Sequence, residues 1–156
     1  MASRKRLPKG SKVRRRPVRS LRKTSKTNFN HPALRRLGFK VLDMDLGIFR
    51  HQIRVLLGPS THLQAYVRHE FGEPDMDCEV GGHRGMAFLK TGHVPIVWLP
   101  RYPRTSREIG TLVHELLHAL RHIFVNVIGF PLDRNTDETF CHALSYTTER
   151  VLEDLK

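Results

Sequence analysis

The sequence predicts an α+β fold, in which a small sheet is followed by two long helices and preceded by a basic tail. Short apolar, β-branched segments occupy residues 51–99, whereas apolar residues at three- and four-residue spacing follow from residue 109 onward. The N-terminal 42 residues hold 15 Lys or Arg and no acidic residue. At 156 residues, the chain has the length of one domain.

Residues 1–36 are assigned to a flexible basic tail and residues 37–156 to the folded domain, because the tail has too few large apolar residues to fold alone. From residue 43 onward the chain carries a net charge of −3. The tail is either a solvated segment or an arm that binds nucleic acid or another polyanion without reading sequence. The proposed contacts are Arg14, Arg15, Arg16, Arg19, Arg22 and Lys23.

The sequence shows neither a secretory signal nor an apolar run of the ~20 residues that span a bilayer. Its two cysteines, Cys78 and Cys141, suggest no disulfide framework. We therefore expect an intracellular, soluble protein with no membrane partner.

The first strand predicted is "HQIRVLLG" (51–58), which is apolar, β-branched and ends at Gly58-Pro59. A short helix should follow over 61–71, capped by Ser60 or Thr61 and ended by Gly72. "GMAFLK" (85–90) and "VPIVWL" (94–99) flank "TGH" and predict a β-hairpin.

Pro95 lacks an N–H for the ladder, so the second arm of this hairpin is predicted to be an edge strand. The segment Thr105-Ser-Arg-Glu108 has the form of a capping box and should open a long helix that Gly129 and Pro131 close. A final helix is predicted from about Thr136 to Leu155.

Three histidines of the long helix, His114, His118 and His122, are predicted to lie opposite its apolar stripe at ~100° per residue. A buried core position therefore explains them poorly, and the alternative to function is an exposed helix face. The stripe consists of Ile109, Leu112, Val113, Leu116, Leu117, Leu120, Ile123, Phe124 and Val127.

The stretch "HELLH" (114–118) matches the H-E-x-x-H pattern of zinc metalloproteases. Residues four apart lie one turn apart, so the imidazoles of His114 and His118 can reach one Zn²⁺. Glu115 then lies beside the metal, where it can deprotonate a bound water. A catalytic site also needs a third protein ligand and an open position.

Downstream residues offer alternatives for the third ligand. The metzincin pattern is excluded, because Arg121 and Phe124 stand where it requires glycine and histidine. His122 lies one more turn along the same helix. A straight helix cannot easily bring side chains from three successive turns to one ion. Glu138, on the exposed side of the final helix, is either a ligand or a carboxylate that favours the helix N-terminus.

His114-Glu115-x-x-His118 followed by Glu138 in "TDETF" resembles the gluzincins, and more closely small phage-encoded zincin-like proteins, over roughly residues 50–155. The resemblance implies that His114, His118 and Glu138 bind zinc and that Glu115 is the general base. It further implies that an edge strand, matched to "VPIVWLP", aligns the peptide. No downstream domain supplies an oxyanion-stabilising group, so His142 and Tyr146 are the candidates within this chain.

Two functions follow from these observations. One is a minimal zincin that uses Zn²⁺ to hydrolyse peptide bonds of a protein or peptide substrate. The other is a non-catalytic protein, associated with nucleic acid or with phage virion assembly, which retains a zincin scaffold and uses the tail. A phage-encoded protein would act in the host cytoplasm or in the virion.

Overall fold

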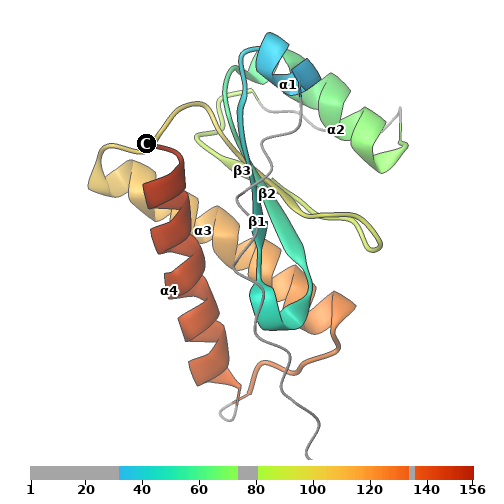
Figure 1. Ribbon diagram of the computed structural model, residues 1–156, viewed down its shortest axis with the longest axis vertical. Helices are drawn as coiled ribbons and strands as arrows, with labels where there is room; N and C mark the ends of the chain where they lie inside the picture. Colours follow the sequence, from blue (N-terminus) through green and yellow to red (C-terminus); the bar gives the residue numbers. More distant parts are fainter. Residues whose placement is uncertain (1–31, 74–80, 134–135) are drawn as a thin grey trace, which may run out of the picture.

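The computed structural model describes residues 32–73, 81–133 and 136–156 and confirms the α+β class (Figure 1). Within these residues, none of the helices combines the length and apolar character needed to cross a bilayer. The helices and strands are α1 (Pro32–Arg36), β1 (Lys40–Asp45), β2 (Gln52–Leu57), α2 (Leu63–Phe71), β3 (Met86–Phe88), β4 (Ile96–Leu99), α3 (Ser106–Arg121) and α4 (Asp137–Asp154).

The four strands form one mixed sheet in the order β1-β2-β4-β3. β1 pairs antiparallel with β2, β2 pairs parallel with β4, and β4 pairs antiparallel with β3. The predicted hairpin is therefore confirmed as β3–β4. β1, absent from the predicted elements, completes the sheet on its other side.

The prediction that "VPIVWL" forms an edge strand is wrong, because β4 lies inside the sheet and all four of its residues are buried. Pro95 precedes the strand, and its carbonyl accepts a hydrogen bond from the Arg54 N–H at 2.9 Å. Its missing N–H therefore removes no bond from the ladder. The edge strand of this hairpin is β3, which has only three residues.

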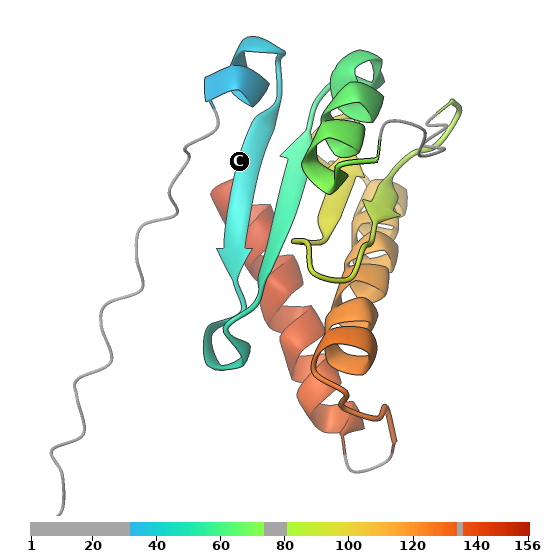
Figure 2. The same cartoon turned by 90° about the vertical axis from the view of Figure 1, so that its right-hand side faces the viewer.

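Alternating side chains of the sheet enter two cores, one on each face. Val97 and Leu99 pack with α3 and α4, whereas Ile96 and Trp98 pack with α1 and α2. Figure 2 shows α2 and α4 on opposite sides of the sheet. The sheet thus has no solvent-exposed face over β4, which explains why its sequence is continuously apolar.

A buried polar network ties α2 to the sheet. Arg54 of β2 is 7% exposed and donates to Asp43 of β1 and to Tyr66 and Glu70 of α2. Burial raises the pKa of the Tyr66 hydroxyl to about 12, so it remains a neutral hydrogen-bonding group. Nothing in the apolar pattern of "QIRVLL" indicated this arginine's role.

The start of α3 is confirmed as a capping box. The Thr105 hydroxyl accepts from the Glu108 N–H, and the Glu108 carboxylate accepts from the Thr105 N–H. The Arg104 N–H and the Arg101 guanidinium, together with the Thr105 N–H, lower the pKa of Glu108 to about 2. This carboxylate therefore stays ionised, and its oxygens are occupied by the N-terminus of α3 and by Arg101.

Two predicted boundaries shift. Ser60 and Thr61 lie inside a 3₁₀ turn and provide no side-chain cap for α2, although Gly72 ends the helix with φ 64° as expected. Leu34 of α1 is 3% exposed within a core, so residues 32–36, which were assigned to the tail, pack with the folded domain.

Candidate metal centre

His114 and His118 lie one turn apart on the exposed side of α3. Their Nε2 atoms are 3.1 Å apart, and their rings meet edge to face at 86°. Leu112 and Leu116, on the opposite side of the helix, are fully buried in the core that α3 forms with the sheet and α4. Core packing therefore fixes which way both imidazoles point.

The separation of the two Nε2 atoms fits a shared metal ion. Zn–N bonds of about 2.0–2.1 Å at a tetrahedral angle place two ligand nitrogens ~3.3 Å apart. The same separation suits a hydrogen bond between a donor and an acceptor imidazole, so a proton and a metal ion would compete for the same lone pairs. The spacing of the pair is therefore compatible with two ligands of one metal ion.

Glu115 faces the edge strand of the sheet. A Cβ atom on Gly85, directly before β3, would lie 3.3 Å from Glu115 Cγ and 2.8 Å from Thr111 Cγ2. Only glycine allows this close approach of β3 to α3, and Glu115 is half-buried as a result. The Glu115 side chain thus lies on the side of α3 that faces β3, the strand at the edge of the sheet formed by the described residues.

We expect Gly85→Ala to destabilise the fold by about 1–3 kcal/mol, because the added methyl overpacks the contact with Thr111 and Leu99. Denaturant unfolding followed by circular dichroism measures the change. Gly81→Ala is the matched control, since nothing lies within 4 Å of a Cβ at Gly81. Equal stability of the two variants would contradict the close approach.

Glu138 is not brought to the two histidines. Its side chain is 85% exposed on the first turn of α4, and its Oε1 lies 3.1 Å from Nε2 of His142, which is 78% exposed. Among the described residues, no three His, Cys, Asp or Glu side chains gather as a metal-binding set. Tyr146, the other oxyanion candidate, is 49% exposed on the same helix.

The prediction that His122 lies opposite the apolar stripe is wrong. His122 is 7% exposed at the start of a π-helical turn, His122–Val127, which continues α3. Each four-residue step advances ~40° around a helix, so His122 lies ~80° from His114 and near the direction of Glu115. Its Nδ1 lies 3.1 Å from Asn126 Nδ2, and its buried Nε2 has no partner among the described residues.

The proposed tail contacts, from Arg14 to Lys23, lie outside the described residues. Gly85, which shapes the surroundings of Glu115, was predicted only as part of a hairpin arm and not as a site residue. Its importance depends on the approach of β3 to α3, which no local pattern encodes.

Comparisons of the chain with protein-family models, with curated proteins and with solved structures gave no match.

Proposed function

We propose that this protein is a zinc-dependent metallopeptidase. The observation that carries the proposal is the convergence of the His114 and His118 Nε2 atoms to 3.1 Å, with Glu115 beside them on the side of α3 that faces β3. A solvated helix face does not require that combination, whereas a metal-activated hydrolase does.

In the proposed mechanism, zinc held by His114 and His118 would supply Lewis acidity and would lower the pKa of a water to about 7. The Glu115 carboxylate would take the proton from the attacking water and pass it to the leaving amine. The scissile peptide lies extended along β3, because its free edge offers backbone hydrogen bonds next to Glu115. β3 thus takes the aligning role that the resemblance assigned to "VPIVWLP".

We propose Glu138 as the third ligand. Phe140 of α4 packs edge to face on Phe124, with ring centroids 5.6 Å apart, so the first turn of α4 lies beside the π-helical turn that continues α3. Glu138 lies ~200° around α4 from Phe140, so ligation would require its side chain to turn toward the histidines. Glu138 is highly exposed and held only by His142 among the described residues, so its side chain is free to rotate. Metal binding would exchange this ion pair for a zinc ligand.

Zinc titration of the full-length protein tests the ligand set. One Zn²⁺ per chain is expected, and Glu138→Gln should weaken binding by at least ~10-fold, because an amide is a poorer zinc ligand than a carboxylate. Competition with a chromophoric chelator measures the affinity.

Glu149→Gln, also exposed on α4, is the matched control and should bind zinc as the unaltered chain does. A chain that binds no zinc would refute the proposed function. Unchanged affinity in Glu138→Gln would remove Glu138 from the site while leaving the two histidines.

A further inference from the structure

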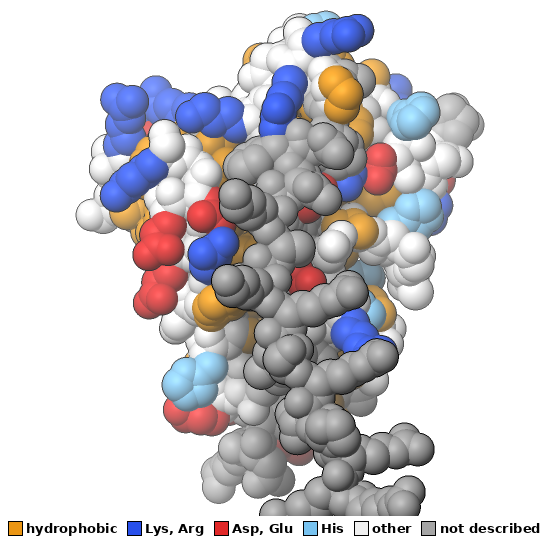
Figure 3. Space-filling view, viewed as in Figure 1, with side chains coloured by type: hydrophobic (Ala, Val, Ile, Leu, Met, Phe, Trp, Pro, Cys, Tyr) orange, Lys and Arg blue, Asp and Glu red, His pale blue; other side chains and the backbone are white. Residues whose placement is uncertain are grey.

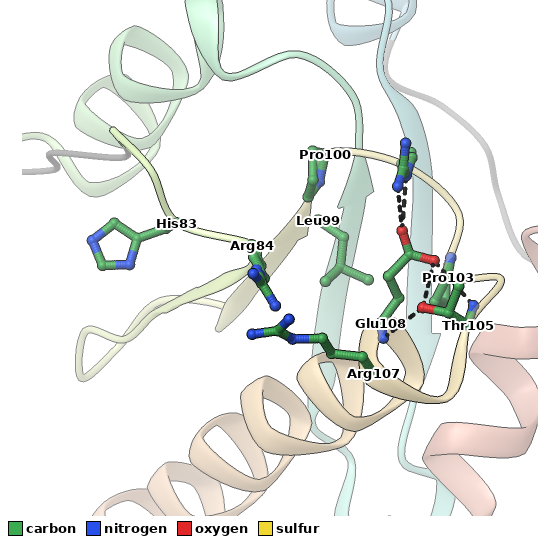
Figure 4. A pocket seen from close by; sticks show the side chains of 9 residues that line it. His83, Arg84, Leu99, Pro100, Pro103, Thr105, Arg107 and Glu108 are labelled. Carbon is green, nitrogen blue, oxygen red and sulfur yellow. Dashed lines mark hydrogen bonds and ion pairs between the residues drawn. The ribbon is translucent and has the colours of Figure 1, made fainter.

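A cavity of about 480 Å³ lies at the N-terminal end of α3 (Figure 4). It is bounded by the end of β4, by the segment before β3 and by the first turn of α3. Its lining includes Arg84, Leu99, Arg101, Thr105, Arg107 and Glu108.

The cavity has an excess of positive charge. Arg84 and Arg107 come from different segments, yet their guanidinium groups point toward one another (Figure 4). Neither forms an ion pair with any residue that the structure describes. Two like charges that converge without a carboxylate between them favour an anion at that point.

The one acidic side chain among the described lining residues cannot serve as this anion. The Glu108 carboxylate accepts from Arg101 at 2.6 Å and from the backbone N–H groups of Arg104 and Thr105 at 2.9 and 3.0 Å. Figure 3 shows further Lys and Arg side chains gathered where α3 begins and α4 ends. The local field is therefore positive after Glu108 is counted.

The cavity continues the face of α3 that carries Glu115. Arg107, Thr111 and Glu115 follow one another at four-residue spacing, and the Thr111 hydroxyl donates to the Arg107 carbonyl at 3.1 Å. The axial distance from Arg107 to Glu115 is therefore ~12 Å. Arg84 directly precedes Gly85, which touches Glu115, so the cavity opens at the same end of the β3 edge.

From this geometry we infer that Arg84 and Arg107 bind a carboxylate of the peptide substrate, three to four residues from the scissile bond. The inference rests on the proposed peptidase function and deepens it by naming an acidic substrate class. A distance of ~12 Å corresponds to three to four residues of extended chain. The carboxylate belongs either to an acidic side chain or to the peptide's C-terminus.

Peptide binding to the full-length Glu115→Gln protein tests the inference without cleavage. The probes are mixtures of fluorescein-labelled octapeptides. One position carries either Asp or Asn, and each of these mixtures is made with a free and with an amidated C-terminus. Fluorescence anisotropy should show a preference of ~10-fold for the Asp mixtures or for the free C-termini. The arm that shows the preference identifies the source of the carboxylate.

Adding Arg84→Gln and Arg107→Gln should abolish this preference. The matched control is Arg36→Gln with Lys40→Gln, which removes two exposed charges at the far side of the sheet and leaves residues 1–31 unchanged. The control should retain the preference. Three results would overturn the inference. The two double variants could lose the preference equally, the Arg84→Gln and Arg107→Gln variant could keep it, or the starting protein could show none.

The outcome is separable from the proposed function, because zinc titration of the same variants is an independent readout. If the protein binds no zinc but Arg84→Gln and Arg107→Gln abolish the acid preference, the anion site is supported and the peptidase function is rejected. Zinc binding with no acid preference would retain the metal site and reject the cavity's role.

Discussion

Replacing His114 or His118 with alanine is expected to abolish zinc binding. The two Nε2 atoms lie 3.1 Å apart and would each supply one metal bond, so either change leaves an incomplete site. Loss of groups that merely orient a ligand costs 10- to 100-fold in affinity, so losing the ligand itself should cost at least ~100-fold. Zinc content after dialysis and chelator competition measure the loss.

The fold of both alanine variants should remain intact, because both imidazoles are exposed and alanine favours helix. His69→Ala provides the matched control, since His69 is an exposed histidine on α2. Full zinc binding by either His114→Ala or His118→Ala, with unfolding midpoints unchanged, would show that the pair is not a metal site.

Glu115→Gln is expected to keep zinc but lower peptide hydrolysis by ~10²–10⁴-fold. The amide has almost the same shape, so the close contact with Gly85 and Thr111 is preserved. It cannot accept the proton of the attacking water at neutral pH. Initial rates at saturating zinc, with metal content measured on the same sample, separate the loss of the base from the loss of the ion.

Glu153→Gln makes the same change on the exposed face of α4 and should leave the rate unaltered. The Glu115→Gln protein also serves as a trap: proteins captured by it become the substrates for the rate measurement. Hydrolysis that survives in Glu115→Gln would exclude Glu115 as the general base.

Local signals predicted the helical half of the fold well. The capping box at Thr105 and the apolar stripe of α3 place His114 and His118 on the exposed side, because helix periodicity depends only on nearby residues. The order of the strands was not predictable in this way. Pro95 lies one residue before β4, so a proline that indicated an edge strand stands outside an internal one.

The remaining wrong or missing predictions depend on rotation of side chains around a helix and on contacts between residues far apart in the sequence. His122 is buried because each four-residue step rotates the side chain further around the helix. Of the three histidines, only His114 therefore lies directly opposite the apolar stripe. The approach of Gly85 to Glu115 joins residues thirty positions apart and leaves no periodic trace. The zinc site stays a prediction: His114 and His118 converge, but Glu138 pairs with His142 in the described structure.

The shortness of β3 sets a limit on how tightly any chain can be held by its backbone alone. In a strand of three residues, N–H and C=O groups face the free side at only one or two positions, which gives at most about four hydrogen bonds. At about 1 kcal/mol net for each bond, they correspond to a dissociation constant near 1 mM at best. A peptide held by these backbone bonds alone would therefore occupy the edge only at high concentration, so the proposed cleavage should favour chains whose side chains provide a second anchor.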